Sequence, residues 1–179
     1  MENTTNKPGM GNFILKYGAL IGAAQVVLLI LFYILGISPL QPGVSIINLV
    51  IVLAINILLL RAGVRKYRES ILEGKIDFLK AFLLGLLTLI VGGIISGAFS
   101  YWFYNAFEPD LMMKYAAEMI DSLADKVPEA QLEMMEERIM RNLTPARQLR
   151  QTLINIPVSS IILSVLVALF IKKDTTLPE

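Results

Sequence analysis

Long apolar stretches constrain this chain more than any other feature of its sequence. They cover residues 13–36, 44–60, 78–104 and 149–171. A helix rises about 1.5 Å per residue, so about 20 apolar residues cross a hydrocarbon core of roughly 30 Å. Each stretch has a length typical of a transmembrane helix. We therefore expect an all-α fold, a bundle of four transmembrane helices.

The overall composition supports lipid as the solvent of this protein. Of 179 residues, 55% are hydrophobic and only 17% are charged, which is too apolar for a soluble domain of this size. The first apolar run is longer than the apolar part of a secretory signal peptide, and no convincing small-x-small cleavage site follows it. We therefore expect the first run to remain as a membrane span of a single membrane domain.

Basic residues predict the orientation of the four spans. A cluster of them lies in the linker 61–77, where the expected topology anchor is Arg61, Arg65, Lys66 and Arg68. Short loops rich in Lys and Arg stay in the cytoplasm. Four spans then place both termini in the cytoplasm as well, in agreement with Lys7, Lys16, Lys172 and Lys173. The expected location is a cell membrane that the chain crosses several times.

The segment 109–144, between the third and fourth spans, has the pattern of two amphipathic helices. Apolar residues recur at helical spacing on both sides of Pro128, with charged residues between them. Proline is tolerated in the first turn of a helix, so Pro109, Pro128 and Pro145 mark three helix starts. We expect a helical hairpin outside the cytoplasm, with acidic residues in excess.

Small residues in two spans predict close helix packing. They recur at intervals of three or four along one helix face, at Gly18, Gly22, Gly85, Gly92 and Ser96. Such stripes let two backbones approach each other in a membrane. Packing inside the bundle explains them, and a homodimer contact or a substrate path are the alternatives.

Four polar side chains lie within the apolar runs: Gln25, Asn48, Asn56 and Asn155. Lipid offers no hydrogen-bond partner, so we expect them to face the interior of the bundle. Interhelical hydrogen bonds explain them, and substrate binding by a small transporter is the alternative. No Asp or Glu lies deep in any span, which argues against a proton-coupled carrier.

Methionine is concentrated in the expected hairpin and suggests a second alternative. Thioethers bind Cu(I), so Met112, Met119 and Met135 are candidate ligands of a copper sensor. Methionine is also an ordinary core residue, and these three share helix faces with Leu and Ile. Packing is the simpler interpretation, and we expect no metal and no cofactor.

The sequence contains neither histidine nor cysteine. The commonest general base at neutral pH and every thiolate nucleophile are therefore missing. We expect a protein that is not an enzyme and that does not bind nucleic acid. Its expected partners are the lipid bilayer and either a second copy of the chain or another membrane protein.

Several motifs resemble a bacterial membrane family labelled domain of unknown function four-one-nine-nine. The motifs are a Tyr-Arg pair, a Gly with a Phe-x-x-Ala-Phe box, and a Pro-Asp pair with a following Lys-Tyr. Here they are Tyr67, Arg68, Gly74, Phe78, Ala81, Phe82, Pro109, Asp110, Lys114 and Tyr115. The resemblance extends from Lys16 to Lys173. It implies a four-span inner-membrane protein and supplies no active site.

The function expected from these observations is a non-enzymatic interaction or accessory protein of the membrane. Its external hairpin or its cytoplasmic linker would contact another protein. A small transporter or channel subunit and a copper sensor remain as alternatives.

Overall fold

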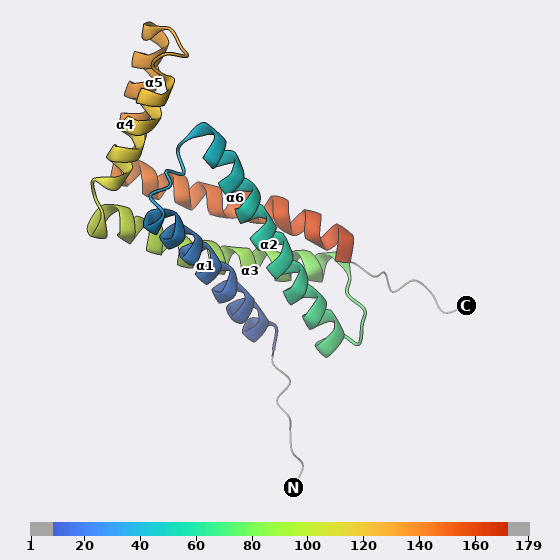
Figure 1. Ribbon diagram of the computed structural model, residues 1–179. Helices are drawn as coiled ribbons and strands as arrows, with labels where there is room; N and C mark the ends of the chain where they lie inside the picture. Colours follow the sequence, from blue (N-terminus) through green and yellow to red (C-terminus); the bar gives the residue numbers. More distant parts are fainter. Residues whose placement is uncertain (1–8, 172–179) are drawn as a thin grey trace. The chain divides into compact units, whose positions relative to one another are not determined.

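The computed structural model describes residues 9–171, and over this range the fold is all-α, as the sequence predicts (Figure 1). No strand occurs among these residues. The helices are α1 (Met10–Ile34), α2 (Pro42–Ile71), α3 (Phe78–Trp102), α4 (Leu111–Leu123), α5 (Glu129–Asn142) and α6 (Pro145–Ile171). A π-helical turn, η1 (Phe103–Phe107), extends α3. Lys7, Lys172 and Lys173, used above for the orientation, lie outside the described residues.

Four of these helices are long and apolar enough to cross a membrane: α1, α2, α3 continued by η1, and α6. Helix α2 is longer than the expected span 44–60, because it continues through the basic residues to Ile71. Arg and Lys are good helix formers, and no proline interrupts the segment. Only residues 72–77 of the expected linker are therefore not helical.

The chain packs as two units, and all four long helices contribute to both. In the described residues, the first unit contains the chain up to Ala24, Ala54–Ile95 and the chain from Ile156. Its core includes Ile21 of α1, Leu60 of α2, Leu84 of α3 and Ala168 of α6, which are all buried.

The second unit contains Gln25–Leu53 and Ser96–Asn155. Its core is Phe103, Leu111 and Tyr115, with half-buried neighbours that include Tyr33 and Met112. Within this unit α4 packs against α5, and the two helices are drawn side by side in Figure 1. Helix α5 begins directly after Pro128 and α6 begins at Pro145, where the prolines predict helix starts.

The connection from α2 to α3 is a tight turn. Glu73 and Gly74 both have positive φ, 52° and 87°, and the Gly74 N–H donates to the Arg68 carbonyl oxygen at 3.0 Å. Glycine adopts this conformation without steric cost. Asp77 then starts α3, because its Oδ1 accepts the backbone N–H of Lys80 at 2.8 Å.

Candidate functional site

Three glycines of the small-residue stripes, Gly18 and Gly22 of α1 and Gly92 of α3, make close contacts between α1 and α3 in the first unit. A Cβ added to Gly18 would lie 2.7 Å from the Val91 Cβ and 2.9 Å from the Thr88 carbonyl oxygen. A Cβ added to Gly92 would lie 2.8 Å from the Ile21 Cγ2 and 3.1 Å from the Gly18 carbonyl oxygen. These separations are shorter than ordinary van der Waals contact, so neither site has room for a side chain. Gly18 and Gly92 therefore serve helix packing.

Gly22 makes the same kind of contact, with Ile95, whereas Gly85 faces Ser164 of α6 at an ordinary distance. Two close contacts lie outside the stripe that the sequence suggested. A Cβ on Gly63 of α2 would lie 2.8 Å from the Tyr17 ring, and a Cβ on Gly93 would lie 2.8 Å from the Ile156 Cγ2. Gly63 lies among charged residues, so a search of the apolar runs for packing glycines does not find it.

The four predicted intramembrane polar residues are divided between the two units. Asn56 is buried in the first unit with 7% of its surface exposed. Gln25, Asn48 and Asn155 belong to the second unit. Gln25 and Asn48 are half-buried, and Asn155 is exposed, which differs from the expected interior position.

Hydroxyl groups complete the buried polar set of the first unit. Thr88 donates to the Leu84 carbonyl oxygen at 2.6 Å, and Ser164 donates to the Ser160 carbonyl oxygen. Each of these bonds stays within one helix and satisfies the hydroxyl without a partner helix. Ser96, predicted as a packing residue, is also buried but lies in the second unit.

The base of the α4–α5 hairpin is held by aromatic side chains. The Phe103 and Tyr33 rings meet edge to face with centroids 5.2 Å apart. The Tyr33 hydroxyl donates to Glu108 Oε1 at 2.5 Å. Asn105 Nδ2 donates to the Tyr101 carbonyl oxygen at 2.8 Å and to Gln148 Oε1 at 3.2 Å. The segments entering and leaving the hairpin are thereby tied to each other.

Away from this base, the hairpin has little burial. Within the described chain, α5 has no buried residue, whereas Leu111, Tyr115 and Ala116 of α4 are buried. Burial of the Tyr115 ring raises the pKa of its hydroxyl, and the nearby Glu118 and Glu108 carboxylates add to the effect. The hairpin therefore has a fixed base and an accessible second helix.

The methionines proposed as copper ligands lie on packing faces. Met112 packs against the Phe103, Leu111 and Tyr115 core. Met119 and Met135 are half-buried, on α4 and α5. Among the described residues, no group of three His, Cys, Asp or Glu side chains is placed to hold a metal ion.

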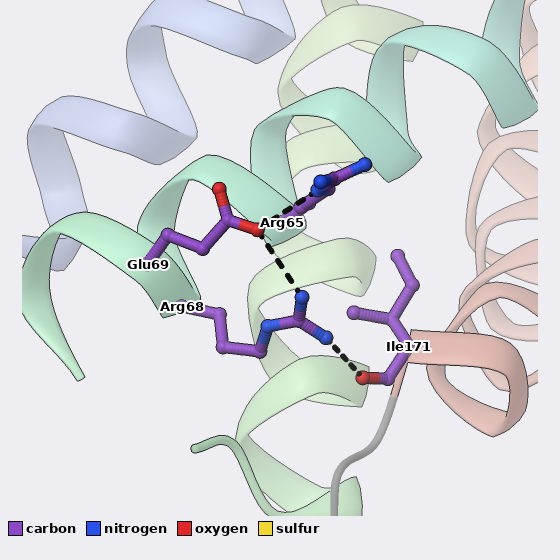
Figure 2. Close-up of polar contacts among 4 residues, drawn as sticks. All are labelled: Arg65, Arg68, Glu69 and Ile171. Atoms are coloured by element: carbon purple, nitrogen blue, oxygen red, sulfur yellow. Dashed lines mark hydrogen bonds and ion pairs between the residues drawn. The ribbon is translucent and has the colours of Figure 1, made fainter. Parts of the chain in front are cut away.

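The basic residues of α2 form a chain of polar contacts with the end of α6 (Figure 2). Arg65 Nε donates to Glu69 Oε1 at 2.8 Å, and Arg68 donates to the same oxygen at 3.3 Å. The other end group of Arg68 donates to the Ile171 carbonyl oxygen at 3.0 Å. A helix ends with carbonyl groups that lack intrahelical partners, so Arg68 caps α6.

Four long apolar helices, close glycine contacts and buried groups that bond within their own helices define a multi-pass helical membrane protein. The chain belongs to the family described as Protein of unknown function (DUF4199), whose model matches residues 16–173. This agrees with the resemblance noted from the motifs. Comparisons with curated proteins and with solved structures found no match.

Proposed function

We propose that this protein is a non-enzymatic membrane protein whose α4–α5 hairpin binds another protein outside the cytoplasm. The observation that carries the proposal is the absence of buried residues in α5, combined with a base fixed by the Phe103 core. A helix whose residues are at most half-buried contributes less to the stability of the fold than a fully packed one. Its surface is available for a partner.

The exposed surface of the hairpin indicates the chemistry of that partner. From Leu111 to Asn142, acidic residues outnumber basic ones, and four of them are Glu129, Glu133, Glu136 and Glu137 of α5. Met134 lies among them with 62% of its surface exposed. Interfaces combine exposed apolar anchors with complementary charge, so the proposed partner has a basic surface.

The orientation belongs to the same proposal. The basic residues at the end of α2 favour the cytoplasmic side for the α2–α3 turn. The hairpin, which is one membrane span further along the chain, then lies on the opposite side of an inner membrane.

Site-specific photocrosslinking tests the proposed contact. A photoreactive amino acid at Met134 should give a discrete protein adduct in intact membranes. The same group at Val27, which is 63% exposed on the apolar helix α1, is the matched control and should not give that adduct. Charge reversal by Glu133→Lys and Glu136→Lys should remove the Met134 adduct. The proposal fails if the group at Met134 gives no protein adduct. It also fails if the adduct forms equally well in both charge-reversal variants.

A second candidate function, a small transporter or channel subunit, is favoured by one observation. Asn56 is a buried amide in the first unit, which also buries the hydroxyls of Thr88, Ser160 and Ser164. Polar groups inside a membrane bundle commonly line substrate paths. Reconstituted vesicles should then show solute flux that Asn56→Leu abolishes while the variant keeps its helical content. Flux that is equal in both proteins would remove Asn56 from any such path.

A further inference from the structure

The last part of α2 has two faces of different chemistry. One face packs in the first unit through Leu60, Gly63 and Val64, which are buried. The opposite face lines an open hollow of about 660 Å³. Its lining consists of Leu58, Ala62, Ser70 and four charged side chains, Arg61, Arg65, Lys66 and Glu69. A cationic hollow therefore lies on the outward face of a membrane helix.

The charges in this hollow do not cancel. Glu69 is its single carboxylate, and it is shared by Arg65 and by Arg68 from outside the lining. Arg61 and Lys66 have no ion-pair or hydrogen-bond partner among residues 9–171. Within the described part of the chain, two positive charges are thus unpaired, and Arg65 retains end groups that do not bond Glu69.

The position of the hollow along α2 favours an anionic lipid over a free phosphate ion as the ligand. Arg61 is the first charged residue after the apolar run of the helix. Leu58, one turn before it, has 65% of its surface exposed, and Ala54 continues the same exposed face. An apolar exposed surface followed by cations corresponds to the boundary between acyl chains and phosphates in a bilayer. A free phosphate ion would contact only the cations and would leave the apolar surface of Leu58 and Ala54 without a partner.

Contacts that begin on the packed side of α2 reach one cation of the hollow, Arg65. Arg68 is anchored on the Ile171 carbonyl oxygen, and it holds Glu69, which in turn holds Arg65 (Figure 2). The Arg65 guanidinium is therefore oriented before any ligand arrives. Such pre-organisation lowers the entropic cost of binding an anion.

From this combination we propose that the hollow on α2 is a binding site for the headgroup of an anionic phospholipid. The phosphate is bound by Arg61, Arg65 and Lys66, and an acyl chain lies along Leu58 and Ala54. Arg presents paired N–H donors that match phosphate oxygens, and Lys adds a point charge. This site is independent of the hairpin and of its proposed partner.

Native mass spectrometry of the full chain tests the site. The protein in a neutral detergent is titrated with phosphatidylglycerol, and separately with phosphatidylcholine. We expect one phosphatidylglycerol molecule to bind, and to bind more tightly than phosphatidylcholine. Each basic residue near an anionic lipid raises the binding affinity by a factor of about five. The double variant Arg61→Gln/Lys66→Gln should therefore bind phosphatidylglycerol with an affinity roughly 25-fold lower. Circular dichroism confirms that the variant keeps its helices.

The matched control removes one charge from the α2–α3 turn and one from the first turn of α3, both outside the hollow. Lys75→Gln/Lys80→Gln has the same net charge as the test variant and should bind phosphatidylglycerol within about twofold of the unaltered protein. If both double variants lost the same affinity for phosphatidylglycerol, binding would depend on diffuse surface charge, and the proposal would be overturned.

Two soluble probes distinguish a lipid site from a simple anion site. Inorganic phosphate and glycerol phosphate should compete with phosphatidylglycerol only at concentrations at least a hundredfold higher, because they lack the acyl chain that contacts Leu58. Competition at equal concentration would overturn the assignment to a lipid. Equal binding of phosphatidylcholine and phosphatidylglycerol would overturn the role of the three cations.

Discussion

Glycine at position 18 lets the backbone of α1 approach α3, because a single hydrogen stands where a side chain would be. The nearest atoms include a backbone oxygen, that of Thr88, which is fixed by its own helix. Since lipid is as apolar as the side chains, close packing rather than water exclusion holds such helices together.

Replacement of Gly18 by Ala should therefore destabilise the protein. Overpacking typically costs about 1–3 kcal/mol, which outweighs the gain of roughly 1 kcal/mol in helix propensity. Thermal unfolding in detergent measures the effect. Gly11→Ala in the same helix is the control, because nothing lies within 4 Å of its added Cβ. An unchanged or raised unfolding midpoint for Gly18→Ala would contradict this prediction, because it would show that α1 and α3 can move apart without a loss of stability.

Asp77 connects a single carboxylate to the stability of α3. The backbone N–H of Lys80 holds the pKa of the Asp77 carboxyl below its usual value of 3.8, and the Lys80 ammonium contributes further. A lowered pKa means that the folded state favours the charged carboxylate. This stabilisation is complete above the usual pKa and is lost as the pH falls through the lower, folded-state value.

The unfolding midpoint of the unaltered protein should therefore fall when the pH drops below about 4. Asp77→Asn keeps a capping oxygen but cannot titrate, so its midpoint should depend less on pH over the same range. Asp77→Ala should have a lower midpoint at neutral pH as well. Identical pH profiles of the unaltered protein and Asp77→Asn would exclude Asp77 as the titrating group.

Among the elements, the α2–α3 turn is the connection most constrained by backbone conformation. Two consecutive residues, Glu73 and Gly74, have positive φ. A left-handed conformation costs an L-residue with a Cβ roughly 1–2 kcal/mol.

Gly74→Ala should consequently lower stability by about 1 kcal/mol, whereas Glu73→Gly should raise it or leave it unchanged. Chemical denaturation in mixed micelles measures both. Open space surrounds Gly74, so a loss in Gly74→Ala reports backbone strain and not a clash. The expected result is a loss of stability in Gly74→Ala and no loss in Glu73→Gly, so a destabilised Glu73→Gly would contradict it.

The hairpin shows how an element can be fixed at one end only. Its base includes the Phe103 core and the Asn105–Gln148 hydrogen bond, while α5 packs against α4 without burying any of its described residues. The hydrophobic pattern predicted both helices. It did not predict that α4 alone supplies the buried residues.

For the whole molecule, the proposed orientation places the α2–α3 turn and the α4–α5 hairpin on opposite sides of the membrane. Because the chain contains no cysteine, single-cysteine variants report each side separately. In intact spheroplasts, Met134→Cys should react with a membrane-impermeant maleimide, and Ser70→Cys should react only after lysis. Reaction of both residues before lysis would contradict four spans, and the reverse pattern would invert the orientation.

Family membership and the all-α architecture could be predicted from the motifs and the apolar runs. The four spans were predicted because length and hydropathy act locally, through the cost of leaving backbone polar groups unpaired in lipid. The bounds were less accurate. Helix α2 continues to Ile71, because a helix does not have to end where the hydrocarbon ends.

The sequence by itself determined the helices, their apolar character and the prolines at which α5 and α6 begin, since these depend on residues near one another in the chain. Only the tertiary structure decided which glycines are contact points, that Gly63 meets Tyr17, and that Arg68 reaches the end of α6. It also buried Asn56 within the first unit and placed basic side chains around one hollow. These features depend on which helix faces meet, and that is settled by packing between residues far apart in sequence.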